Sequence, residues 1–76
     1  MKMGIYKHYK GKFYQVLGVA LHTETLEEVV VYQSLHEPFS LWVRPGVMFE
    51  ETVIFNEVTI LRFQYISPGI TESPKI

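Results

Sequence analysis

The 76-residue chain contains neither cysteine nor aspartate. Without cysteine it can form no disulfide, no thiolate metal site and no cysteine nucleophile. Without aspartate it can build no aspartate-dependent triad and no aspartate dyad. The absence of cysteine also fits a cytoplasmic protein, because small secreted domains usually rely on disulfides.

Long hydrophobic runs are missing as well. No apolar stretch approaches the roughly 20 residues of a membrane helix, and the basic N-terminal segment lacks the apolar region of a signal peptide. The formal net charge is −1, so there is no overall basic surplus for nucleic acid. The five glycines fit no phosphate-binding spacing, and no serine has nucleophile-elbow context. We therefore expect a cytoplasmic, non-catalytic protein with no cofactor and no membrane association.

What the chain does have is apolar and β-forming material. Hydrophobic residues make up 47% of the sequence and aromatic residues 14%, enough for one small folded domain. β-branched and aromatic residues cluster in short runs between turn signals. The expected strands cover residues 5–9, 13–22, 28–35, 40–44, 51–55 and 58–66. Because no helix is available to cover a flat sheet, the pattern favours an all-β fold, a small SH3-like barrel of five or six strands.

Several local features are also predicted. A short 3₁₀ turn should follow Pro45, a hairpin should turn at Asn56-Glu57, and Gly18 should mark a bend or bulge in its strand. Residues 1–66 should form the domain and residues 67–76 a terminal tail. A barrel this small needs large rings in its core, and the rings expected there are those of Tyr9, Phe13, Phe39, Phe49, Phe55 and Phe63.

The best candidate site lies in Leu41-Trp42-Val43-Arg44-Pro45. Strand alternation places Trp42 and Arg44 on one face, where they form either a structural cation–π pair or a ligand platform. The arginine would offer a fixed fork for a carboxylate or phosphate, and the ring of Tyr32 would extend the flat apolar area. The predicted function is binding of a protein or peptide partner, and the full predicted site comprises Trp42, Arg44, Tyr32, Gln33, His22 and Glu24.

Two alternatives remain open. The first is single-stranded nucleic-acid binding by a basic and aromatic N-terminal segment, whose residues are Tyr6, His8, Lys10, Lys12 and Tyr14. The second is an enzyme or metal site around His22, Glu24 and Glu27. That spacing matches no compact metal motif, and a competing interpretation is that His22 and Glu24 bond to each other or to the turn backbone. We expect no metal, and a monomer or weak dimer.

An ordered series of short motifs points to a known family. The series comprises Tyr6-Lys7-His8-Tyr9-Lys10-Gly11, Val16-Leu17-Gly18-Val19-Ala20, His22-Thr23-Glu24-Thr25-Leu26-Glu27, Val31-Tyr32-Gln33, Leu41-Trp42-Val43-Arg44-Pro45 and Met48-Phe49. It resembles a family of small bacterial proteins classed as a domain of unknown function. The resemblance implies a compact, stand-alone cytoplasmic domain and implies no reaction. Members of that family tend to carry a glycine turn where this chain has Asn56-Glu57-Val58.

Overall fold

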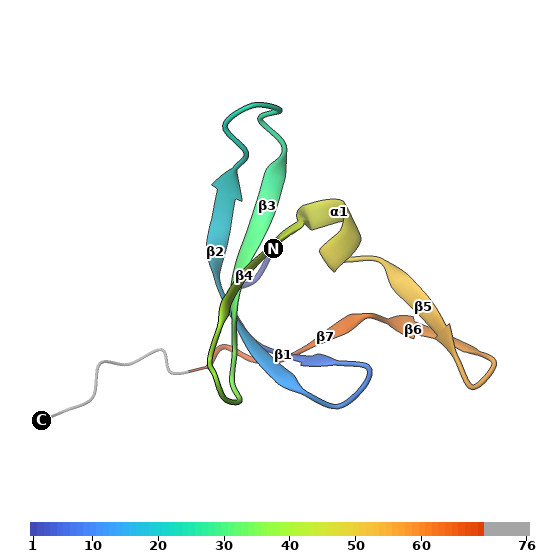
Figure 1. Cartoon of the computed structure of the whole chain (residues 1–76). Coiled ribbons are helices and arrows are strands. Elements are labelled where there is room, and N and C mark those ends of the chain that lie inside the picture. Colours follow the sequence, from blue (N-terminus) through green and yellow to red (C-terminus); the bar gives the residue numbers. More distant parts are fainter. Residues whose placement is uncertain (70–76) are drawn as a thin grey trace, which may run out of the picture.

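The all-β prediction is confirmed. The computed structural model describes residues 1–69, and residues 70–76 of the expected tail lie outside the described residues. The described residues form seven strands and one helical turn, which can be followed in Figure 1: β1 (Gly4–His8), β2 (Phe13–Leu21), β3 (Glu28–Ser34), β4 (Leu41–Pro45), α1 (Gly46–Phe49), β5 (Thr52–Phe55), β6 (Val58–Leu61) and β7 (Phe63–Ser67). Within residues 1–69, no helix has the length and apolarity needed to span a membrane.

The strands form two separate antiparallel sheets. The larger sheet has five strands in the order β4-β3-β2-β1-β7, and the smaller sheet is the β5–β6 hairpin. The edge strands of the five-stranded sheet, β4 and β7, do not pair with each other. This sheet is therefore not closed into a barrel by hydrogen bonds. The register of β2 against β3 shifts between Val16 and Gly18, which is the irregularity predicted for Gly18. Such a bulge bends and twists the strand, and Figure 1 shows β2 curving along its length.

Two sequence predictions are corrected, one about the type of turn after Pro45 and one about the length of the last strand. The turn after Pro45 is a single α-helical turn and not a 3₁₀ turn, because the amide of Glu50 donates to the carbonyl of Gly46, four residues back, at 3.1 Å. The expected strand 58–66 is interrupted at Arg62, which separates β6 from β7. The arginine amide donates to the carbonyl of Glu51 at 3.1 Å, so the chain changes direction there.

The core lies on one side of the five-stranded sheet, which we call the inner face. Its six buried apolar residues are Tyr6, Val16, Val30, Tyr32, Phe49 and Phe63. The ring of Phe49, delivered by α1, stacks on Phe63 with centroids 4.2 Å apart and planes at 4°. Tyr6 and Tyr32 meet Phe49 edge-on, at 5.4 and 5.3 Å between centroids. Such aromatic pairs are each worth about 0.5–1.5 kcal/mol beyond the area they bury.

The aromatic residues do not all enter this core. Phe49 and Phe63 are buried as predicted, but Phe13, Phe39 and Phe55 are 43, 50 and 45% exposed. The prediction that these three fill the core is therefore wrong. Tyr9 is half-buried. The number of aromatic residues indicates how large a core a small chain can build. Which of these residues are buried depends on how the elements are layered over the sheet.

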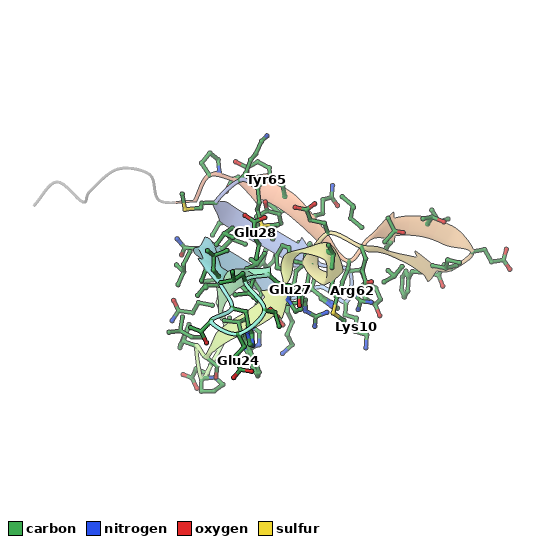
Figure 2. All side chains as sticks on the ribbon, turned by 90° about the horizontal axis from the view of Figure 1, so that it is seen from above. Lys10, Glu24, Glu27, Glu28, Arg62 and Tyr65 are labelled. Carbon is green, nitrogen blue, oxygen red and sulfur yellow. The ribbon has the colours of Figure 1, made fainter. Side chains whose placement is uncertain are left out.

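The β5–β6 hairpin stands apart from the sheet. We call residues 52–61 the arm. Asn56 and Glu57 have φ angles of 50° and 65°, which is the two-residue turn with positive φ that joins short hairpins. The predicted hairpin turn is thus confirmed. The arm pairs with neither edge of the five-stranded sheet, and it projects from the body in both Figure 1 and Figure 2.

Candidate functional site

Three of the six predicted site residues lie together on the inner face. Tyr32 pairs directly with Trp42 across β3 and β4, and Val30 pairs with Arg44 one inward-facing row further on. Because paired residues of antiparallel strands share a face, Trp42 and Arg44 flank the buried Tyr32. The Trp42 side chain is 50% exposed and Tyr32 only 5% exposed. Trp42 therefore forms a rim, and Tyr32 forms the floor beneath it.

Around this trio the inner face contains a cavity of about 200 Å³. It is lined by His8, Tyr14, Tyr32, Trp42, Arg44 and Phe63, which come from all five strands of the sheet. The Tyr14 ring lies edge-on to both Tyr32 and Phe63, with centroids 5.6 Å apart in each case. The walls are therefore mainly aromatic. We call this cavity the aromatic–arginine pocket.

The orientation of the Trp42 ring is fixed by a hydrogen bond. Its indole Nε1 donates to the Oγ of Ser34 at 2.8 Å. Ser34 is itself only 3% exposed, and its backbone amide donates to the carbonyl of Ser40 at 3.0 Å. An exposed ring held in one orientation loses little conformational freedom when a ligand packs on it. Trp42 is thus preorganised for contact.

Arg44 brings a cation to the pocket. Its guanidinium carbon lies 5.8 Å from the centroid of the Phe63 ring, within cation–π range. Among the described residues the salt bridge found joins Arg62 to Glu51 at 2.9 Å, and Arg44 has no carboxylate partner there. The guanidinium therefore lies against an aromatic ring, and its hydrogen-bond donors stay available to a ligand.

Three positive charges act on His8, which lines the pocket. Burial lowers the pKa of His8 below its usual value, and the positive charges of Arg62, Lys10 and Arg44 lower it further. The Nδ1 atom accepts a hydrogen bond from the backbone amide of Lys10 at 3.1 Å, which leaves the proton of the neutral ring on Nε2. The ring packs edge-on to Phe63 at 5.0 Å. A site surrounded by cations in this way favours an anionic ligand.

The other three predicted site residues do not line this pocket. His22 and Glu24 belong to the β2–β3 turn, where the His22 Nδ1 accepts the backbone amides of Glu24 at 3.1 Å and Thr25 at 3.4 Å. This matches the competing interpretation that His22 bonds to the turn backbone. Gln33 lies on the opposite, outer face of β3, because it directly follows the inward-facing Tyr32. Its Nε2 donates to the carbonyl of Phe39 at 3.0 Å, which ties the β3–β4 connection to the strand.

Sequence reasoning missed His8, Tyr14 and Phe63 as pocket residues. Two of them, His8 and Tyr14, stood in the proposed nucleic-acid set, and both face inward. Lys7, which is not in that set, pairs with Phe13 on the outer face and places its Nζ 5.7 Å from that ring. In residues 1–69, no group of three or more histidine or glutamate side chains is placed to hold a metal ion.

Fold and pocket together define a small all-β protein with an aromatic–arginine pocket on the inner face of a bent five-stranded sheet. Residues 4–65 match the profile of DUF1653, a protein family of unknown function, and the chain belongs to that family. It is similar to the crystal structure of a DUF1653 protein from Bordetella bronchiseptica, with 35% sequence identity and a TM-score of 0.84. That match covers 96% of this chain and 95% of the other. A search of curated proteins found no match.

Proposed function

We propose that this protein is a non-catalytic binding module whose aromatic–arginine pocket recognises a protein or peptide segment that carries a carboxylate beside a flat or apolar side chain. One observation supports this above all. Arg44 has no carboxylate partner among the described residues, and it lies beside the preorganised, half-exposed Trp42. The arginine fork fits a carboxylate, and the rings offer apolar area next to it.

The size of the pocket favours a polypeptide partner over a free small molecule. Pockets for drug-sized ligands measure about 300–1,000 Å³, whereas this one is about 200 Å³. It therefore suits one side chain or one chain terminus of a larger partner. The rest of the binding free energy would come from the surface around the pocket, as is usual where a few anchor residues dominate an interface.

The polar groups of the pocket support binding and not catalysis. The Nδ1 atom of His8 is occupied by the Lys10 amide, and the Ser34 hydroxyl accepts from Trp42. No side-chain hydrogen bond joins His8 to a hydroxyl or carboxylate in residues 1–69. Nucleophilic catalysis needs such a base–nucleophile pair.

An NMR titration with a minimal probe tests the proposal. N-acetyl-phenylalanine carries a ring and a carboxylate, and its primary amide is the same molecule without the charge. The single tryptophan gives one indole resonance that reports on the pocket. We expect saturable shifts of this resonance with the acid, and binding roughly tenfold weaker with the amide, because a hydrogen bond to a charged group contributes about 1.5–3 kcal/mol.

Two variants act as the test and its control. Arg44→Gln should abolish the preference for the acid, whereas Lys7→Gln, on the outer face, should preserve it. If acid and amide bind equally, or if Arg44→Gln leaves the preference intact, the proposed role of the arginine is wrong. A single-stranded oligoribonucleotide in the same titration tests the nucleic-acid alternative, which predicts shifts that weaken steeply with salt.

A further inference from the structure

The arm has one entirely apolar face. In its register Val53 opposes Ile60 and Phe55 opposes Val58, so these four side chains share a face. Phe55 remains 45% exposed and Val58 57% exposed. The rest of the molecule contacts this face through the Tyr9 ring, which lies edge-on to Phe55 with centroids 5.6 Å apart. An isolated two-stranded hairpin is only marginally stable in water, so a partner that covers this face would stabilise the arm.

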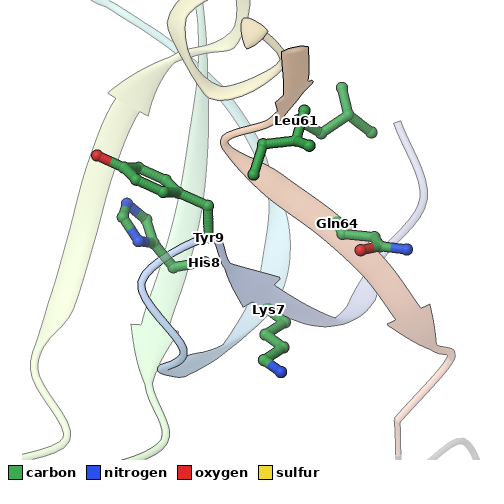
Figure 3. A pocket seen from close by; sticks show the side chains of 6 residues that line it. Lys7, His8, Tyr9, Leu61 and Gln64 are labelled. Atoms are coloured by element: carbon green, nitrogen blue, oxygen red, sulfur yellow. The ribbon is translucent and has the colours of Figure 1, made fainter. Parts of the chain in front are cut away.

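A cavity of about 390 Å³ lies where the arm joins the body. It is lined by Lys7, His8, Tyr9, Ile60, Leu61 and Gln64, most of which are labelled in Figure 3. We call this the root cavity. Ile60 belongs both to the cavity wall and to the apolar arm face, so the two surfaces are continuous. An occupant of the root cavity would therefore also cover the apolar side of the arm.

The charges of the arm and of its root have opposite sign. Glu57, at the tip, is the only charged residue in the ten-residue arm. At the root, Lys7 lines the cavity, and Lys10 holds its Nζ 5.8 Å from the ring of Tyr9. Neither lysine forms a salt bridge within residues 1–69. An element that is negative at its tip, apolar along one face and positive at its root is complementary to a reversed copy of itself.

We infer that the arm is a dimerisation element and that its partner is a second copy of this chain. The two arms pack antiparallel about a twofold axis, with their apolar faces in contact. Each tip then reaches the root cavity of the other copy, where Glu57 meets the lysines and Phe55 and Val58 pack beside Tyr9. Each arm strand has four residues, about 13 Å at the usual rise, so one reversed arm spans the other from tip to root. The same patch serves both copies, as a closed twofold dimer requires.

Sedimentation equilibrium of the full chain, from low micromolar to near-millimolar concentration, tests this inference. We expect the wild-type protein to dimerise reversibly. Val58→Asp should weaken dimerisation at least tenfold, because it places a charge in the apolar contact. Ile54→Asp is the matched control, since Ile54 lies on the other face of the same arm and is 80% exposed. It should dimerise like wild type, and the amide resonances of the arm, together with the Trp42 indole resonance of the sheet, verify that both variants remain folded.

A charge exchange separates the proposed geometry from general stickiness of the arm. Glu57→Lys should weaken the dimer several-fold, and so should the double variant Lys7→Glu, Lys10→Glu. The three changes together should restore the affinity, because tip and root then attract with reversed signs. A wild-type protein that stays monomeric throughout, equal effects of the two aspartate variants, or failure of the combined charge variant to recover would each overturn the inference.

Discussion

The inner face of the sheet and the arm use similar residues in opposite ways. On the inner face, Phe49 and Phe63 are 1 and 5% exposed, whereas in the arm Phe55 and Ile54 are 45 and 80% exposed. The sheet bends at its bulge, and α1 places a ring over the resulting hollow. Within residues 1–69 the arm has two strands and no second layer packed over them. Apolar residues thus become a core only where a second layer covers them.

The two regions also offer different recognition surfaces. The inner face presents an aromatic–arginine pocket in which Ser34 and Phe63 hold Trp42 and Arg44 in position. Such a pocket selects a ligand by charge and shape. The arm presents a continuous apolar face with one charge at its tip, which suits packing against a like surface. The two proposals thus assign one surface of this 76-residue chain to a foreign partner and another to a second copy of the chain.

Truncating one phenylalanine in each region should give the largest difference in unfolding free energy between the two regions. Phe49→Ala removes a ring that stacks on Phe63 and is 1% exposed, so it should cost about 3–5 kcal/mol of unfolding free energy. Phe55→Ala should cost less than about 1 kcal/mol, because that ring is already half in water. Urea unfolding of dilute protein, followed by Trp42 fluorescence, measures both. Comparable losses would contradict the view that the arm lies outside the core.

Removing the hydroxyl of Ser34 should have a smaller effect, centred on the pocket. Ser34→Ala leaves the indole N–H of Trp42 without its acceptor, and we expect a loss of about 1 kcal/mol. Ring order at Trp42 should fall as well, which fluorescence anisotropy of the single tryptophan reports. Ser40→Ala is the control, because Ser40 contributes its backbone carbonyl and not its hydroxyl to this region. Unchanged anisotropy in Ser34→Ala would mean that packing alone orients the ring.

Acidification should lower the stability of the sheet, because it protonates His8. Its pKa is lowered in the folded protein, by burial first and then by nearby cations. Between that lowered pKa and the unfolded value of about 6.5, the unfolded chain binds more protons, so stability falls as the pH falls through this window. His8→Asn keeps an acceptor for the Lys10 amide and should flatten the loss. A variant that loses stability as steeply as wild type would assign the effect to other groups.

The sequence predicts those parts of the fold that depend on residues close together in the chain. It does not predict the parts that depend on contacts between distant residues. The strands from residue 5 to residue 44 follow from local patterns of β-forming residues and turns. The break at Arg62 does not, because it depends on a backbone bond and an ion pair with Glu51, eleven residues away. The burial of Phe49 and the exposure of Phe55 are equally non-local. Both rings stand in apolar segments, and only the sheet topology separates them.

The candidate site shows the same limit. Trp42 and Arg44 share a face because they stand two apart in one strand, and this was predictable. The same alternation excludes Gln33, which directly follows the inward-facing Tyr32. His8 and Phe63 join the pocket through the pairing of β1 with β7, which places them opposite each other. No local pattern specifies that register, so the sequence could not bring those side chains together.

The smallest expected effect lies at the arm turn, and it tests whether arm and sheet unfold separately. Glu57 has a φ angle of 65°, which costs little for glycine and more for a side chain with a Cβ. Glu57→Gly should stabilise the hairpin by about 0.5–1 kcal/mol, and amide hydrogen exchange of dilute protein should slow about two- to fivefold within the arm. Amides of β3 should not respond, because the arm pairs with neither edge of the sheet.

Asn56→Gly should slow amide exchange in the arm less, since asparagine tolerates positive φ. If β3 amides slowed as much as arm amides, the two regions would be one cooperative unit, and the exposed apolar face of the arm would then be supported from within its own chain.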